Sequence, residues 1–281
     1  MRRHELSDVE WAALEPFLPP VVTGGRPRSD DRRVLNAVAW KIRSGVPWRD
    51  LPERYGSWGS VYTRFRRWAL DGTFTAMLAG VQARAGAAGD VDWLVSVDST
   101  VVRAHQHAAG AKRGRSETGE SDHALGRSRG GLTTKIHAAC DGRGRVLAFV
   151  LTGGQVNDFT AFEPLMAAIR IPRLGPGRPR ARPDHVIADK GYSSKAVRAY
   201  LRRRGIGHTI PERSDQQANR TRRGQRGGRP PVFDRQVYRR RNVVERCFNQ
   251  LKQARGVATR YDKTRTSYQA TITIAALLQW I

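Results

Sequence analysis

The first part of the chain repeats apolar residues with the period of an α-helix. Ser7 and Glu10 have the spacing of a capping box, and the helix that they open ends at a pair of prolines. A second helical pattern begins at two adjacent aspartates and ends at Gly45, because glycine favours helix termination. Ser57 can cap a third helix, which runs through VYTRFRRWALDG. We therefore predict a small all-helical domain over residues 1–80.

The pattern changes to that of β-strands from Trp93 onward. Segments rich in β-branched residues predict strands over residues 93–104, the hairpin 132–154 with its turn at Asp141–Gly142, 185–192 and 205–213. Helical patterns lie between and after them, over residues 159–170, 193–205 and 232–256. The order, three strands followed by alternating helices and strands, is that of a ribonuclease-H-like fold. We predict an α/β domain over residues 90–281, with a mixed five-stranded sheet and flanking helices.

Three further segments lack such patterns or end the chain. Residues 105–131 and 213–230 are rich in Gly, Arg and Ser and poor in apolar residues, so we predict long loops that are either functional or flexible. The apolar segment TITIAALLQWI at residues 271–281 fits a last helix, or a reading frame that once continued.

The chain is strongly basic. Its 281 residues include 50 Lys and Arg against 25 Asp and Glu, which gives a net charge of +25. Such an excess is typical of proteins that bind a polyanion such as DNA. A GC-rich genome would explain Arg in place of Lys, but it would not explain the surplus of cations over acids. We therefore predict a nucleic acid partner.

Nothing in the sequence predicts export or a membrane. The N-terminus lacks the apolar core of a signal peptide, and the longest apolar run, ITIAALLQWI, has about half of the roughly 18 residues that a membrane helix needs. Cys140 and Cys247 form no CxxC motif and fit two small buried residues in a reducing compartment. We predict a cytoplasmic, nucleoid-associated protein with no membrane partner.

The third helix of the first domain carries a cluster of basic residues. Arg64, Arg66 and Arg67 alternate there with aromatic residues, which fits a helix-turn-helix module whose last helix enters the major groove. A helical bundle with a solvated basic face is the alternative. The predicted DNA contacts of this domain are Arg49, Trp58, Arg64 and Arg67.

Two aspartates interrupt apolar strands. Asp98 lies within LVSVDSTVV, and Asp189 follows the apolar residues of VIADKGY, where an acid is costly to bury without a cation or strong donors. If the first and fourth strands are parallel, the two carboxylates lie side by side at the edge where α/β sheets place their sites. Adjacent carboxylates repel and therefore suit Mg²⁺ or Mn²⁺. The alternative is that each aspartate caps a turn on its own.

A third acid lies on the predicted helix 232–256. At about 100° per residue, four polar side chains fall within a stripe of about 60°. They are Tyr238, Arg241, Glu245 and Lys252. The apolar face that packs this helix onto the sheet comprises Val243, Val244, Phe248 and Leu251. Glu245 would complete a metal site, whereas the alternative is an exposed i,i+4 pair with Arg241. As DNA contacts, Arg241 and Lys252 could hold phosphates and Tyr238 could pack against a sugar or base.

These residues carry a resemblance to a known family. The helix matches the Y-x2-R-x3-E-x6-K signature of bacterial insertion-sequence transposases, and VDST and ADKGY resemble that group's two aspartate motifs. The opening from LSDVEW to LPERYGSW and the segment GRSRGGLTTKIHAACD are similar too, so the resemblance covers nearly the whole chain. The chain resembles the insertion-sequence-five family of DDE transposases.

The resemblance implies an enzyme that moves DNA. Asp98, Asp189 and Glu245 would be the catalytic triad, and the substrates would be the double-stranded terminal inverted repeats of a mobile element and target DNA. Paired ends imply a homodimer or a higher homo-oligomer. Two Mg²⁺ or Mn²⁺ ions about 3.5–4 Å apart would support hydrolysis of a strand, and the freed 3′-hydroxyl would then attack the target.

Further basic residues are candidate DNA contacts. Lys190 and Lys252 flank the acids in sequence, and Arg127 and Arg129 lie among glycines that allow close approach to a DNA backbone. The alternative for each is a solvated cation. The histidines show no zinc-finger spacing, so their roles stay unassigned.

Two other functions remain open on the sequence alone. One is a DNA-binding regulator derived from an inactive transposase, against which the intact triad argues. The other is a ribonuclease-H-like nuclease that cleaves without strand transfer. The separate N-terminal domain and the basic loops favour a protein that holds specific DNA ends.

Overall fold

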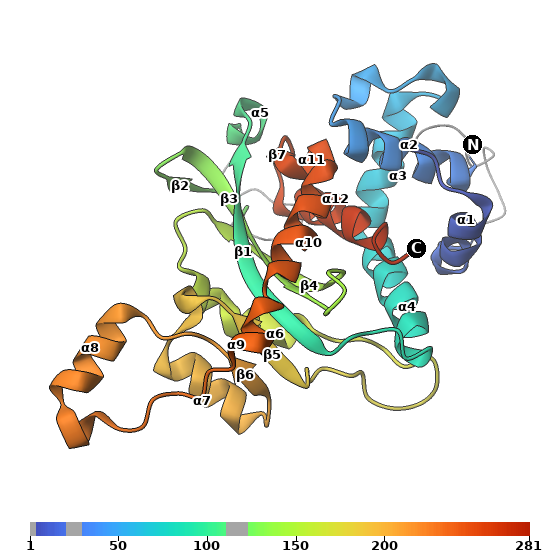
Figure 1. Ribbon diagram of the computed structural model, residues 1–281. Coiled ribbons are helices and arrows are strands. Elements are labelled where there is room, and N and C mark those ends of the chain that lie inside the picture. Colours follow the sequence, from blue (N-terminus) through green and yellow to red (C-terminus); the bar gives the residue numbers. More distant parts are fainter. Residues whose placement is uncertain (1–3, 21–29, 111–122) are drawn as a thin grey trace.

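The computed structural model describes residues 4–20, 30–110 and 123–281, and it consists of a β-sheet between two layers of helices, with a helical bundle at one side (Figure 1). No helix within these ranges is long and apolar enough to cross a membrane.

The N-terminal helices begin and end where local signals predict. The Glu10 amide donates to Ser7 Oγ and the Ser7 amide donates to Glu10 Oε2, which is the predicted capping box. Gly45 ends its helix with a φ of 74°, and a Cβ there would lie 2.7 Å from Cβ of Arg255. Ser57 is the N-cap residue of the third helix, although its side chain makes no cap hydrogen bond. The elements are α1 (Asp8–Leu14), η1 (Glu15–Phe17), α2 (Asp31–Ser44), η2 (Trp48–Asp50), η3 (Glu53–Tyr55), α3 (Trp58–Leu70) and α4 (Thr73–Ala87).

In the described part of the chain, seven strands form one mixed sheet. They are β1 (Leu94–Ala104), β2 (Gly126–Ser128), β3 (Gly131–Cys140), β4 (Val146–Gly153), β5 (His185–Ala188), β6 (Gly207–Thr209) and β7 (Thr259–Arg260). β3 pairs antiparallel with β1 and with β4, whereas β5 pairs parallel with β1 and with β6. The order β4-β3-β1-β5-β6 with these directions is that of the predicted ribonuclease-H-like fold, and all five predicted strands are present.

The two remaining strands were not predicted. β2 pairs with the start of β3, and β7 pairs with Arg103 and Ala104 at the end of β1. Each has only two or three residues, which is too short for an alternating pattern to appear in the sequence. The sheet is therefore larger than the five strands that the sequence predicts.

Different helices cover the two faces of the sheet. One face is covered by α10 (Asn242–Gln253), α11 (Arg255–Ala258) and α12 (Arg265–Leu277), and the other by α6 (Phe162–Ala168), which follows η4 (Asp158–Ala161), and α7 (Lys195–Arg203), which follows η5 (Lys190–Tyr192). The predicted last helix is α12, and it packs against α3 and α4. The buried side chains of the N-terminal helices therefore join the core under α10 to α12. The division into domains 1–80 and 90–281 stays a prediction.

Three predictions of secondary structure are wrong or incomplete. The predicted loop 213–230 contains α8 (Ser214–Arg222) and η6 (Gly224–Gly227), and Figure 1 shows α8 projecting from the body. No residue of α8 is buried, so it has no apolar stripe by which to predict it. The predicted loop 105–131 contains α5 (Gln106–Ala109) and β2, while its residues 111–122 lie outside the described ranges. The predicted single helix 232–256 is divided into α9 (Arg235–Arg239), α10 and α11.

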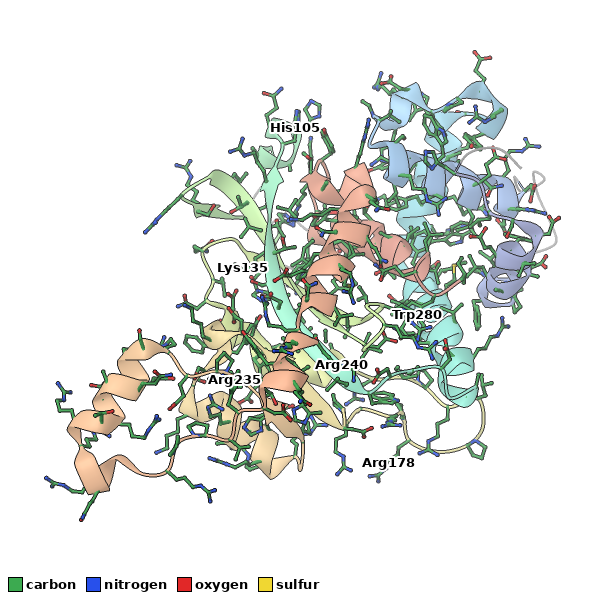
Figure 2. All side chains as sticks on the ribbon, in the orientation of Figure 1. His105, Lys135, Arg178, Arg235, Arg240 and Trp280 are labelled. Atoms are coloured by element: carbon green, nitrogen blue, oxygen red, sulfur yellow. The ribbon has the colours of Figure 1, made fainter. Side chains whose placement is uncertain are left out.

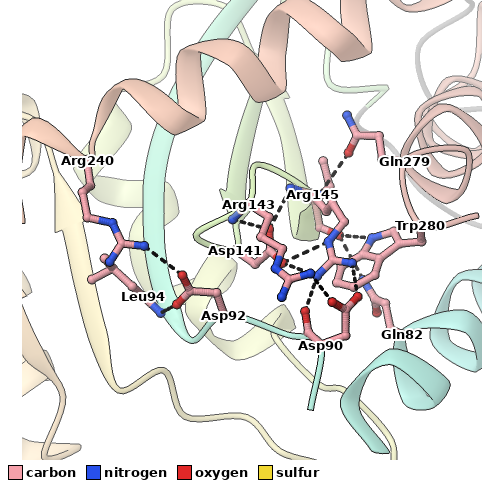
Figure 3. Close-up of polar contacts among 11 residues, drawn as sticks. Gln82, Asp90, Asp92, Leu94, Asp141, Arg143, Arg145, Arg240, Gln279 and Trp280 are labelled. Atoms are coloured by element: carbon pink, nitrogen blue, oxygen red, sulfur yellow. Dashed lines mark hydrogen bonds and ion pairs between the residues drawn. The ribbon is translucent and has the colours of Figure 1, made fainter. Parts of the chain in front are cut away.

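An ion-pair network joins the start of β1, the turn between β3 and β4 and the C-terminus (Figure 3). Arg145 donates from Nε to Asp141 Oδ2 at 3.0 Å and from Nη1 to Asp90 Oδ2 at 2.6 Å. Its guanidinium carbon lies 4.1 Å from the ring centroid of Trp280, whose Nε1 donates to the Val146 carbonyl at 2.9 Å. The network thus fixes the C-terminal residues onto β4.

Candidate active site

Asp98 and Asp189 come next to each other where β5 ends beside β1. The two strands run parallel, and Val97 of β1 is paired with Ala188 of β5. The following residue on each strand is an aspartate, so the two carboxylates follow adjacent backbone positions. The sheet therefore brings together the two acids that the sequence predicts as neighbours.

Backbone amides and burial set the state of these carboxylates. Asp98 Oδ1 accepts a hydrogen bond from the Ser99 amide, and Asp189 Oδ1 accepts one from the Gly191 amide, both at 2.8 Å. Burial raises the pKa of the Asp98 carboxyl above its ordinary value, the Ser99 amide opposes this, and the charge of Asp189 raises the pKa further. The nearby hydrogen-bond donors therefore do not fully balance the negative charge of the two aspartates.

Arg241 lies between Asp98 and Glu245. Its Nη1 donates to Asp98 Oδ2 at 2.8 Å and its Nη2 donates to Glu245 Oε1 at 2.6 Å. Burial alone would lower the pKa of Arg241, but the surrounding carboxylates, Asp98 foremost, raise it. The guanidinium of Arg241 therefore bridges the carboxylates of Asp98 and Glu245. Within the described residues, no group of three or more His, Cys, Asp or Glu side chains is placed to hold a metal ion.

The helix that carries Glu245 packs as its sequence pattern predicts. Its apolar face is buried at all four predicted positions, Val243, Val244, Phe248 and Leu251. Lys252 Nζ donates to Thr100 Oγ1 on β1 at 2.7 Å, and burial lowers the pKa of this lysine. Tyr238 lies on the separate helix α9, where its ring contacts Phe233 at 5.1 Å between centroids. At the break between α9 and α10, Arg240 forms an ion pair with Asp92 at 2.9 Å (Figure 3).

The other predicted DNA contacts lie in three places. Lys190 is exposed directly after Asp189, in η5. Arg127 and Arg129 are exposed on the hairpin of β2 and β3. Arg49 and Arg67 are exposed on the N-terminal helices.

Arg64 and Trp58 differ in their surroundings on α3. Arg64 Nη1 pairs with Asp31 Oδ1 at 2.6 Å, and both side chains are largely buried, so the pair joins α2 to α3. The ring of Trp58 is partly exposed and lies 5.0 Å from the guanidinium carbon of Arg49. Their roles as DNA contacts stay predictions.

A polar cluster on the other side of β1 was not predicted. Ser99 Oγ donates to Asp158 Oδ1 at 2.7 Å, and Lys135 Nζ, beside β1 in Figure 2, donates to the same atom at 2.9 Å. His137 Nδ1 lies 3.8 Å from that oxygen, and Tyr192 is buried close enough for the charge of Asp158 to raise its pKa, after burial itself. We call these five residues the Asp158 cluster.

The Asp158 cluster connects the segments that follow both aspartates. Ser99 comes directly after Asp98, and Tyr192 ends the turn after Asp189. One signal in the sequence was available, because Lys135 and His137 are two positions apart on β3 and so share a face of the sheet. His137 is opposite Ser99 in the register of β1 and β3, which only the pairing reveals.

Two protein families match the chain. Residues 6–78 match the family described as "Putative transposase of IS4/5 family", and residues 90–280 match the family described as "Transposase DDE domain". The second match covers more than half of the chain and includes all three predicted acids.

Individual relatives match shorter stretches. The chain is 46% identical over 109 residues to the uncharacterized protein y4sN of Sinorhizobium fredii, covering 38% of this chain and 83% of that protein. It is 29% identical over 150 residues to "Putative transposase for insertion sequence element IS6501" of Brucella ovis, covering 53% of this chain and 99% of that protein. It is 45% identical over 80 residues to "Putative transposase for insertion sequence element IS402" of Burkholderia cepacia, covering 28% of this chain and 38% of that protein.

A solved structure of Mos1 transposase, in a paired-end complex with the left transposon end, is distantly similar. The alignment covers 84% of this chain and 82% of that chain at 14% identity, with a TM-score of 0.25. The strand order and strand directions of the chain itself identify its fold.

Proposed function

The chain belongs to the DDE transposases of the IS4/IS5 group, and on that basis we propose that Asp98, Asp189 and Glu245 are its catalytic residues. The observation that carries the proposal is the parallel register of β1 and β5, which puts two aspartates at adjacent backbone positions. Glu245 is connected to them through Arg241, which binds Asp98 and Glu245 with the two ends of one guanidinium.

The donor atoms of this site suit a divalent cation. Three carboxylates face one guanidinium here, and carboxylate oxygens are the ligands that Mg²⁺ and Mn²⁺ prefer. We propose that Asp98, Asp189 and Glu245 together hold two such ions once Arg241, which lies between Asp98 and Glu245, releases their carboxylates. Bound there, the ions would activate a water and stabilise the leaving 3′ oxygen during in-line displacement at the phosphate.

Basic residues lie beside the acids, and we propose that they bind the DNA backbone. Arg241 shares both carboxylate partners with the proposed metal site, so once released its guanidinium can donate to a phosphate oxygen. Lys252 lies beside β1 at Thr100, and Lys190 is exposed next to Asp189. Both lysines can therefore position a strand by its phosphates.

We propose that the substrates are the terminal inverted repeats of the element and a target duplex. The enzyme hydrolyses a strand at the repeat and joins the freed 3′-hydroxyl to the target. Arg49, Trp58 and Arg67 of the N-terminal helices bind the repeat, while Arg127 and Arg129 approach the backbone from the hairpin of β2 and β3. Two ends held at once require a homodimer or a higher homo-oligomer, which works at the bacterial nucleoid.

Strand cleavage and joining on a labelled duplex test this proposal. The full chain is incubated with Mg²⁺ and a duplex carrying the element's ends, and nicked and joined products are separated. We expect both products from the wild type and neither from Asp98→Asn, Asp189→Asn or Glu245→Gln. Asp184→Asn is the matched control, because this exposed aspartate pairs with Arg180 outside the site.

Two other outcomes would each contradict part of the proposal. Nicks without joined products would indicate a nuclease that lacks strand transfer. Firm binding of the ends without any nick would indicate a DNA-binding regulator.

A further inference from the structure

A pocket of about 820 Å³ lies between the N-terminal helices and the far end of β1. One wall comes from η2 and the start of α3, and the other from α5 and the chain between β7 and α12. Figure 2 shows His105, which directly precedes α5, at the opposite end of β1 from Arg240. The pocket is therefore separate from the three acids and is built by two parts of the chain that match different families.

Aromatic rings form much of this pocket. The rings that line it are Trp48, Trp58, Tyr62 and Tyr261. Trp58 remains 38% exposed, and Tyr261 is half-buried with its ring centroid 4.8 Å from that of His105. Trp48 and Tyr62 pack against each other at 5.4 Å between centroids, so Trp58 and Tyr261 offer the apolar ring area on which another ring can stack.

The charges around the rings are mainly positive. Among the described residues that line it, Arg49, Arg66 and Lys263 carry positive charge and Asp262 is the one acid. Asp262 already accepts a hydrogen bond from Thr271 at 3.2 Å. The pocket thus combines cations and aromatic faces, and its partner should carry both negative charge and planar rings.

We propose that this pocket binds unpaired nucleotides of the DNA on which the active site acts. An unpaired base exposes both faces of its ring and is joined to phosphates, so it can use the aromatic walls and the cations together. In a duplex each base face is covered by the neighbouring bases, and aromatic walls add nothing. The proposal depends on the proposed function only in taking DNA as the substrate.

The position of the pocket relative to the acids fits one strand of DNA. Asp98 and Ala104 are six residues apart on β1, which at about 3.3 Å per residue is a separation of about 20 Å. At about 3.4 Å per nucleotide this distance corresponds to about six nucleotides of a strand. Lys252, which donates to Thr100 on the same face of β1 as Asp98, lies along the way, so a phosphate of such a strand has a cationic partner.

Binding of single-stranded and duplex DNA by matched variants tests the proposal. The probes are a labelled oligothymidylate of about 20 nucleotides and a duplex of the same length, both longer than the about six nucleotides between site and pocket. We expect Trp58→Ala and Tyr261→Ala each to weaken binding of the oligothymidylate about tenfold, the loss typical of one base stack. Trp58→Phe should retain binding, because it keeps an aromatic face. The duplex lacks the terminal-repeat sequence that Trp58 is proposed to bind, so its binding should change little in any of them.

Leu70→Ala is the control, because Leu70 is an exposed residue at the other end of α3 and outside the pocket. It should bind both probes as the wild type does. Equal losses on duplex and single strand for Trp58→Ala would overturn the proposal, and so would no loss on either. Circular dichroism and a thermal midpoint establish that each variant is folded.

Photo-crosslinking of the wild type gives a second reading that needs no variant. Oligothymidylate containing 4-thiothymidine should crosslink to peptides that include Trp58 or Tyr261, and crosslinks confined to other peptides would refute the proposal.

The Asp98→Asn variant tests the pocket independently of the proposed function. That variant should lose cleavage but bind the oligothymidylate normally, whereas a wild type that binds through Trp58 yet never cleaves would contradict only the proposed function.

Discussion

Two clusters of acidic and basic side chains lie near β1, and they differ in their balance of charge. The hairpin cluster comprises Asp90, Asp141, Arg143 and Arg145. The site cluster comprises Asp98, Asp189, Glu245 and Arg241. The first has as many cations as acids, whereas the second has three acids for one arginine.

The difference appears in the pKa values of the aspartates. The hydrogen bond from Arg145 lowers the pKa of Asp90 below its ordinary value, while burial and the charge of Asp189 raise that of Asp98. A balanced cluster stabilises the fold, because each carboxylate has its own donor. We propose that the unbalanced cluster on the same sheet receives cations, and that its excess of acid distinguishes a reactive site from a structural one.

Replacing Asp98 by Asn should have the largest effect, and it should fall on activity. We expect strand cleavage to fall by at least about three orders of magnitude, or about 4 kcal/mol of transition-state stabilisation, because a proposed metal ligand is lost. Stability should not fall, because the repulsion with Asp189 is relieved. Cleavage rates and urea unfolding of the same preparation measure both. A destabilised Asp98→Asn variant would indicate that the site cluster is a scaffold too.

The same change in the hairpin cluster should have the opposite result. Asp141 is fully buried and accepts hydrogen bonds from two amides and from Arg145 Nε and Nη2. In Asp141→Asn an amide NH₂ faces these donors and Arg145 loses a charge partner, so we expect unfolding to become about 3 kcal/mol easier. Cleavage per folded molecule should stay within about twofold of the wild type, about 0.4 kcal/mol.

Arg143→Ala is the control for this comparison. The side chain of Arg143 is 58% exposed, so its ion pair with Asp90 should contribute less than about 1 kcal/mol. Equal destabilisation by Arg143→Ala and Asp141→Asn would show that the buried Asp141 contributes no more to stability than the exposed Arg143.

The Asp158 cluster should make the stability of the fold depend on pH, through His137. Burial lowers the pKa of His137 from 6.5 to about 4, so between these values the unfolded chain binds more protons than the folded one. Stability is therefore complete above the unfolded pKa and is lost as pH falls toward the folded pKa. Between about pH 7 and pH 5 we expect a loss of about 2 kcal/mol from this residue. Urea unfolding at both pH values, with His137→Asn as reference, measures it. An equal pH dependence in both proteins would refute this assignment.

Divalent metal should change stability the least of these treatments, and it should do so only by binding to the site cluster. At about ten times its dissociation constant, Mn²⁺ should stabilise the wild type by about 1.4 kcal/mol. Mn²⁺ should stabilise Asp98→Asn by less than it stabilises the wild type. It should stabilise Asp141→Asn by as much as the wild type. Thermal unfolding with and without Mn²⁺ provides the comparison. A full increment in Asp98→Asn would place the bound metal elsewhere.

Local patterns in the sequence determine much of this protein. The capping box of Ser7 and Glu10, the helix end at Gly45 and the five main strands all depend on residues a few positions apart, so short-range rules predict them. The order of the acids along these elements, together with the apolar face of α10, predicts that they belong to one site.

Only the tertiary structure decides how distant residues meet. The break before α10 and the contact of Arg241 with Asp98, 143 positions away in sequence, follow from packing against β1 rather than from helical period. The Asp158 cluster and the aromatic pocket likewise join residues from separate elements. The sequence by itself thus determined the main strands and the N-terminal helices and singled out the three acids. The pairing of strands decided the placement of charges around these acids, because charge interactions depend on separation in space.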